Sequence, residues 1–261
     1  MKNFSSLLLL LALTSQLALA QEKKVVSTKE SRFLGLNWYM EKYEDGTKSY
    51  AFSSPDQPMP ELNRKPSKFR SGLQTDLGIN SWAPTENIPQ VKAWGSWNVG
   101  LNYAGTYLAS KNFHLKSGIG VSWYNFKLDD RDLFIDRTAD GLVFSEFSEG
   151  IGTKSKLSAS FANLTLIPTL LTNNGKVRFG LGGFAGLRIG GRGKFVYDDS
   201  DGNQEKIFTK SPMYVNNFRY GPRAEIGIGD VNLYFNYDAN SLFETGKGPD
   251  VHALSFGLIF K

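Results

Sequence analysis

Most of the C-terminal three quarters of the sequence alternates between apolar and small or polar side chains with a period of two. Such alternation is typical of β-strands, because successive side chains of a strand point to opposite faces. In the first such segment, Leu77 and Ile79 lie on one face, whereas Asp76 and Asn80 lie on the other. The alternating segments cover residues 69–80, 94–108, 112–126, 156–171, 176–192, 218–229, 231–241 and 250–260. Most of them reach the ~9 to 11 residues of a tilted membrane crossing.

The connections between these segments alternate in length. They are short after the second, fourth and sixth segments, at Ser110–Asn112, Asn173–Gly175 and Gly229–Asp230, and long after the others. The longest spans roughly residues 128–155. Outer-membrane barrels have short periplasmic turns and long external loops. The sequence therefore predicts an all-β fold, an eight-stranded antiparallel up-and-down transmembrane β-barrel in the outer membrane of a Gram-negative cell.

The strands of a soluble barrel of the lipocalin type would also alternate between apolar and polar residues. The composition of the polar face must therefore distinguish a soluble barrel from a transmembrane one. The polar face here is rich in Gly, Ser and Asn, which suits side chains converging inside a narrow barrel better than a solvated surface. No segment after the N-terminus approaches the ~20 apolar residues of a membrane-spanning helix. Aromatic residues near strand ends suit interfacial girdles; they are Trp94, Trp97, Tyr103, Tyr107, Trp123, Tyr124, Tyr220, Tyr237 and Phe260.

The N-terminal quarter has a different organisation. Residues 1–20 combine a basic start, a short apolar block and an Ala-Leu-Ala end, which predicts a cleaved signal peptide. In residues 21–68, a turn at Glu44–Thr47 predicts a hairpin, and three prolines follow it closely. We expect a periplasmic arm or partial hairpin here, because proline interrupts strand pairing. Two added strands, giving a ten-stranded barrel with residues 69–261, are the alternative.

Several charged residues fall on the inward phase of the predicted strands. Charges inside a narrow barrel must pair, because an unpaired buried charge is costly. We expect a polar network in the lumen formed by Asp76, Arg178, Arg188, Arg219, Arg223, Glu225 and Asp238. Arg192 falls on the same phase. A gate or ion path is the functional alternative, but eight strands leave room only for side chains or one small ligand.

Little in the sequence points to catalysis or to a bound cofactor. The only histidines, His114 and His252, open the third and eighth predicted strands and therefore lie at opposite ends of the barrel. The absence of Cys excludes disulfides and thiolate metal sites. Asp199–Asn203 is better interpreted as a hairpin tip than as a calcium loop. No catalytic residue, metal or cofactor is predicted, and the dispersed net charge of +5 gives no nucleic-acid footprint.

Four segments resemble the PorT-like outer-membrane β-barrel proteins of Bacteroidetes. They are Trp94–Val99, Gly118–Phe126, Phe218–Gly221 and Gly246–Pro249. The resemblance covers roughly residues 69–260 and implies an eight-stranded barrel preceded by a signal peptide. It implies no catalytic residue, and the chain ends Phe260-Lys261 rather than on the aromatic residue that usually closes such barrels.

These observations favour a non-enzymatic outer-membrane barrel that acts in envelope integrity or as an accessory to export or assembly. The resemblance motivates the export version. A lipid-modifying barrel enzyme and a surface adhesion protein are the alternatives; the first lacks a reactive cluster, and only the long loops suggest the second. The expected partners are outer-membrane lipid and lipopolysaccharide, together with other envelope proteins.

Overall fold

The computed structural model describes residues 25–33, 36–53, 68–82 and 88–261, and within these ranges it contains strands but no helix. Three strands precede the barrel: β1 (Val25–Phe33), β2 (Leu36–Tyr43) and β3 (Lys48–Ser53). The barrel strands are β4 (Phe69–Trp82), β5 (Trp97–Leu108), β6 (Phe113–Lys127), β9 (Ile151–Leu171), β10 (Val177–Asp198), β12 (Phe218–Ile228), β13 (Val231–Tyr237) and β14 (Ala253–Phe260). The connections contain β7 (Leu133–Arg137), β8 (Leu142–Glu146) and β11 (Gln204–Thr209). The predicted signal peptide, residues 1–20, lies outside the described residues.

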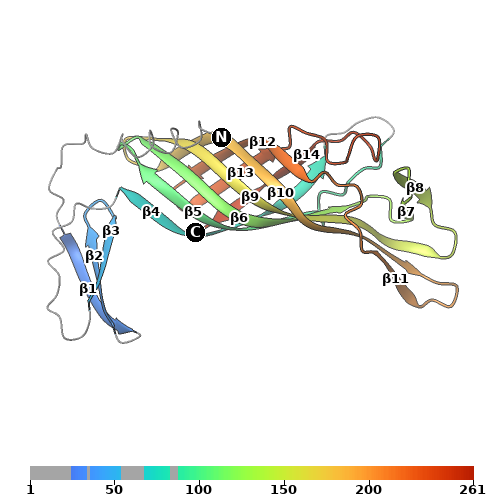
Figure 1. Cartoon of the computed structure of the whole chain (residues 1–261), viewed down its shortest axis with the longest axis horizontal. Coiled ribbons are helices and arrows are strands. Elements are labelled where there is room, and N and C mark those ends of the chain that lie inside the picture. Colours follow the sequence, from blue (N-terminus) through green and yellow to red (C-terminus); the bar gives the residue numbers. More distant parts are fainter. Residues whose placement is uncertain (1–24, 34–35, 54–67, 83–87) are drawn as a thin grey trace, which may run out of the picture. The chain divides into compact units, whose positions relative to one another are not determined.

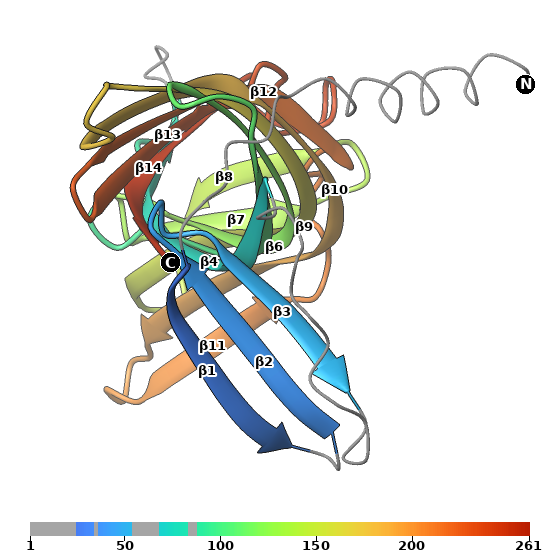
Figure 2. The same ribbon diagram turned by 90° about the vertical axis from the view of Figure 1, so that its left-hand side faces the viewer.

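Eight strands form a closed antiparallel ring. The order is β4-β5-β6-β9-β10-β12-β13-β14, and β14 returns to β4 with Phe260 opposite Thr75 and Ala253 opposite Trp82. Figure 2 shows the ring along its axis. Because each strand pairs with the next barrel strand in the chain, the topology is up-and-down. The predicted eight-stranded antiparallel barrel is confirmed.

The ring has two unlike ends, which we call the turn end and the loop end. The turn end carries the short connections β5–β6, β9–β10 and β12–β13, together with the start of β4 and the end of β14. The loop end carries the four long connections. There, β9 and β10 run 21 and 22 residues and extend beyond the ring, where β11 pairs with β10 (Figure 1).

The strand boundaries differ from the predicted ones mainly at the loop end. The strand predicted from residue 94 begins at Trp97, because Gly95 takes a φ of +119° and turns the chain. The predicted tip at Asp199–Asn203 is confirmed as the turn between β10 and β11. Backbone amides of Asn203 and Asp201 donate hydrogen bonds to the Asp199 carboxylate and lower its pKa.

The N-terminal segment forms a separate unit, which is divided from the barrel between Lys68 and Phe69. In it, β1, β2 and β3 form an antiparallel sheet in which each strand pairs only with others of the three. The hairpin predicted at Glu44–Thr47 is confirmed as the β2–β3 turn, whereas β1 was not predicted. The ten-stranded alternative is wrong, because these strands do not enter the ring.

An apolar cluster fills the loop end of the barrel. Side chains from the strand ends meet others from the long connections, and Trp82 stacks on Phe126 with ring centroids 5.4 Å apart. The buried members are Trp82, Tyr124, Phe126, Leu128, Ile135, Leu157, Ala159, Phe161, Met213, Val215, Leu242, Phe243, Val251 and Ala253. The loops therefore close this end with a packed core.

The rest of the barrel wall reverses the usual distribution of polarity. On β9, the outward Leu164 and Leu166 are 60% and 54% exposed, whereas the inward Phe161 and Ile167 are buried with polar Asn163 and Thr165 between them. Outward Leu, Ile, Val, Phe and Tyr side chains on all eight strands are similarly exposed. Monomeric soluble proteins rarely expose large continuous apolar surfaces. The described part of the chain contains no helix that is long and apolar enough to cross a membrane.

Candidate functional site

A chain of alternating charges crosses the lumen. Arg223 and Glu225 lie two residues apart on β12 and so share its inward face. The Arg223 guanidinium contacts Glu225 Oε1 at 2.8 Å and Asp76 Oδ2, from β4, at 3.0 Å. Glu225 Oε2 in turn accepts a hydrogen bond of 2.6 Å from Lys116 Nζ of β6. Two cations and two anions therefore balance each other.

Neutral side chains also contact this chain of charges. Gln74 Nε2 donates to Asp76 Oδ1 at 3.0 Å, and Arg223 Nη1 donates to Asn236 Oδ1 at 3.3 Å. The Tyr234 ring lies 4.7 Å from the Arg223 guanidinium. These polar partners hold the four charges in one arrangement.

Glycine makes room for the Tyr234 side chain in the crowded lumen. A Cβ atom at Gly78 on β4 would lie 2.5 Å from the Tyr234 hydroxyl and 2.2 Å from the backbone oxygen of Phe256. Any larger residue at this position would displace the backbone or the tyrosine. The glycine-rich inward phase therefore reflects close packing inside the barrel.

A second ion pair lies nearer the loop end. Arg219 Nη2 donates to Asp238 Oδ1 at 2.7 Å, and both side chains are almost fully buried. The Arg219 guanidinium also lies 4.0 Å from the Tyr124 ring centroid and 4.5 Å from that of Phe184. A cation over an aromatic face is attracted by the ring, most strongly where water is excluded. Asp238 and three aromatic rings, the third being that of Phe161 at 5.2 Å, thus surround the Arg219 charge.

The structure pairs five of the seven residues predicted for the lumen network, in two groups: Asp76, Arg223 and Glu225 in the chain of charges, and Arg219 with Asp238. Arg178 lies apart from them at the turn end, where it donates to the backbone oxygens of Gly175 and Gly229. Arg188 lies near the loop end and is hydrogen-bonded to Asn217.

The assignment of Arg192 to the inward phase is wrong. An irregularity in the pairing of β10 with β9 between Arg188 and Gly190 shifts the alternation by one residue. A β-bulge of this kind moves every later side chain to the other face. Arg192 is therefore exposed on the outside of the barrel.

The predicted network lacked Lys116 and Tyr124, which contact its charged residues. Lys116 fell on the inward phase of its strand, so the period-two pattern could have identified it as a member. Tyr124 was assigned to an interfacial girdle, but only 4% of it is exposed, and its ring packs on Arg219. A position near a strand end suggested a place in the girdle. Tyr124 is buried instead, because the loop connections cover that end of the lumen.

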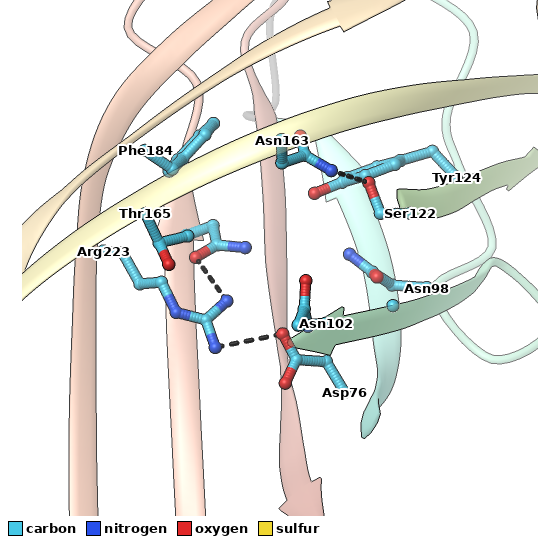
Figure 3. A pocket seen from close by; sticks show the side chains of 11 residues that line it. Asp76, Asn98, Asn102, Ser122, Tyr124, Asn163, Thr165, Phe184 and Arg223 are labelled. Carbon is cyan, nitrogen blue, oxygen red and sulfur yellow. Dashed lines mark hydrogen bonds and ion pairs between the residues drawn. The ribbon is translucent and has the colours of Figure 1, made fainter. Parts of the chain in front are cut away.

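The cavity beside the chain of charges is small. A cavity of about 30 Å³ is lined by Arg223 and Asp76, which contact each other at 3.0 Å (Figure 3). Asn163 donates a hydrogen bond to the Ser122 hydroxyl on the opposite side (Figure 3). This volume holds about two water molecules at most, whereas a drug-sized ligand needs roughly 300 Å³ or more. The site is therefore a packed polar core, and a lipid chain does not fit into this cavity.

The histidines lie far from each other, as their positions in the sequence predict. His114 is at the turn-end start of β6, and His252 precedes β14 at the loop end. His252 stacks on Tyr237 and pairs through Nδ1 with the backbone oxygen of Asp238. Among the described residues, no group of three or more His, Cys, Asp or Glu side chains is placed to hold a metal ion.

Comparison with known proteins identifies no relative of this chain. No family model matches the sequence, and neither a curated protein nor a solved structure matches the chain.

Proposed function

We propose that the chain is an outer-membrane β-barrel protein that works without catalysis, in envelope integrity or as an accessory to export or assembly. The observation that carries the proposal is the reversed polarity of the wall: apolar side chains are exposed outside, and ion pairs are buried inside. Such a wall is stable where hydrocarbon surrounds it. Water would leave its outward Leu, Ile and Phe side chains solvated at a large cost.

The packed lumen supports a role through surfaces rather than through transport. The ion pairs occupy the middle of the lumen, and the apolar cluster closes its loop end. Side chains can fill the interior of an eight-stranded barrel, so we expect no continuous water path through this one. The parts available to other molecules are the loop connections, the outward face and the N-terminal sheet.

The resemblance of four segments to the PorT-like proteins favours the export or assembly version of this role. The N-terminal sheet suits that version. If the loop end faces outside, we expect the turn end and the N-terminal sheet to lie in the periplasm. There they can contact envelope proteins that deliver or assemble surface components.

Deletion of the gene tests the role. We expect the deletion strain to lose surface-exposed proteins from its outer membrane while its lipid A keeps the same acyl chains. Quantitative proteomics of washed outer membranes and mass spectrometry of lipid A measure the two effects in one culture. Expression of the full chain from a plasmid should restore the surface proteins.

Two other results would contradict the proposal. Altered lipid A acyl chains with an intact surface proteome would make the protein a lipid-modifying enzyme. Loss of attachment to surfaces, with proteome and lipid A unchanged, would make it an adhesion protein.

A further inference from the structure

A row of lysines crosses the outer face of the barrel beyond the apolar wall. Lys127 of β6 pairs directly with Lys156 of β9, and Lys156 pairs with Lys194 of β10. The three side chains share the outward phase, and Lys154 and Arg192 flank them on the same face. Directly opposed residues of antiparallel strands lie about 5 Å apart, where like charges repel.

The described carboxylates offset this row only weakly, through the longer-range interaction of Asp129 with Lys127. Within the described residues, no carboxylate lies within salt-bridge distance of Lys127, Lys156 or Lys194. Partial burial, followed by the neighbouring cations, lowers the pKa of each of the three ammonium groups. The wall therefore holds a concentrated positive charge that a multiply charged anion would stabilise.

The position of the row matches the headgroup layer of the proposed membrane. The outward side chain two rows nearer the turn end is Trp123, at the edge of the apolar wall. Lys127 lies four residues beyond Trp123 on β6. Four residues along a strand span about 13 Å, which is roughly 10 Å along the membrane normal for a strand tilted by about 40°. The lysines thus lie where lipid headgroups begin.

A hollow lies between the row and the apolar wall. Its volume is about 290 Å³, and its lining includes the small residues Ser158, Ala159 and Ser160 of β9 and Gly191 of β10. Trp123 of β6 and Arg192 of β10 also line the hollow, and the Arg192 guanidinium lies 5.4 Å from the Phe208 ring centroid of β11. Serine hydroxyls, an indole ring and a guanidinium suit a sugar that carries phosphate.

We propose that this surface binds the phosphorylated sugar headgroup of a glycolipid of the lipid A type. The phosphates would lie on Lys127, Lys156 and Lys194, the sugar would fill the hollow beside Trp123, and the acyl chains would follow the apolar wall. The proposal rests on the proposed location in the outer membrane, with the loop end outside. It adds a specific lipid site to that location.

The test compares lipid binding by the full chain and by two variants of equal charge. In the first variant, Lys127, Lys156 and Lys194 are each replaced by Gln. In the control, the exposed Lys68, Lys111 and Lys176 at the turn end are replaced in the same way. Native mass spectrometry of the detergent-solubilised protein, titrated with bisphosphorylated lipid A, gives the dissociation constants.

We expect the first variant to bind roughly 100-fold more weakly, about fivefold for each lysine near an anionic headgroup. The control should bind like the unmodified chain, and dephosphorylated lipid A should bind the unmodified chain as weakly as the first variant binds lipid A. Equal affinities of the two variants would overturn the proposal. So would equally tight binding of phosphatidylglycerol, or full competition by millimolar inorganic phosphate, since neither needs a glycolipid.

Failure of this inference is distinguishable from failure of the proposed location. A Cys placed at Leu164 in the apolar wall of protein reconstituted in vesicles reports membrane insertion, because lipid shields it from a water-soluble maleimide. If Leu164→Cys is shielded and lipid A does not bind, only the glycolipid site is wrong. If Leu164→Cys reacts, the location itself is wrong, and the glycolipid site is wrong with it.

Discussion

Asp238→Leu is expected to lower the free energy of unfolding of the barrel by about 3 to 5 kcal/mol. Asp238 is the ion-pair partner of Arg219, at 2.7 Å, and only 3% and 2% of the two residues are exposed. Removing the carboxylate leaves a guanidinium buried without a counter-charge. The Tyr124 and Phe184 rings still face the cation, and an aromatic face at a desolvated site offsets about 2 kcal/mol, which is less than the expected loss.

The measurement uses the gel mobility of the folded barrel. Samples are heated stepwise, and the temperature at which the fast-migrating folded band converts to the unfolded band is recorded. The double variant Asp238→Leu with Arg219→Met should regain most of the lost stability, because no orphan charge remains. Asp201→Leu, at the exposed β10–β11 tip, should convert like the unmodified chain. An unchanged conversion temperature for Asp238→Leu would mean that water reaches this pair.

Glu225→Leu is expected to have a similar effect for a different reason. Glu225 contacts two cations, Arg223 at 2.8 Å and Lys116 at 2.6 Å. Its removal leaves these two cations facing the single carboxylate of Asp76, so the lumen gains an uncompensated positive charge. We expect a loss of about 3 to 5 kcal/mol, which the same gel conversion assay detects.

The rescue of Glu225→Leu depends on which cation is removed with it. Adding Lys116→Met leaves Arg223 paired with Asp76 at 3.0 Å, which is a complete ion pair. Adding Arg223→Leu instead removes the ion-pair partner of Asp76, while Lys116 has already lost its partner Glu225. We therefore expect Lys116→Met to restore more stability than Arg223→Leu. The opposite order would contradict the chain of charges seen in the lumen.

The strand order and the inward phase could be predicted from the sequence, because both depend on local patterns. A period of two assigns each residue to a face, and alternating connection lengths place successive strands side by side. The same pattern placed Asp76, Arg219 and Arg223 inside the barrel. All three are buried there.

The partners of each charge could not be predicted, because they depend on the registers of the whole ring. Lys116 and Glu225 are 109 residues apart and meet across the lumen. Each strand pairing sets how far one strand is displaced along its neighbour. The heights of Lys116 and Glu225 along the barrel axis depend on all the pairings between their strands, and no local sequence pattern gives that total displacement. Arg178 illustrates the result: it is on the inward phase but too near the turn end to reach a carboxylate.

Irregular positions account for the remaining errors. The bulge between Arg188 and Gly190 reverses the phase of Arg192, and a glycine-rich segment gives no sign of where the extra residue lies. At the loop end, β9 and β10 continue past their predicted limits because β10 finds a new partner in β11. Lys194 of the lysine row lies in the extension of β10, and its place on the outer face depends on the corrected phase.

Cysteine labelling in intact cells tests the central claim, an outer-membrane barrel with its loop end outside, most directly. Single cysteines replace exposed residues at the loop end (Asp201, Thr245), exposed residues at the turn end (Asn174, Asp230) and the outward Leu164. With a maleimide that does not cross membranes, the loop-end pair should label on intact cells and the turn-end pair only after permeabilisation. Leu164→Cys should stay unlabelled in both conditions, because lipid covers it. Labelling of Leu164→Cys together with the other four would contradict the account, because a wall that faces water is that of a soluble barrel.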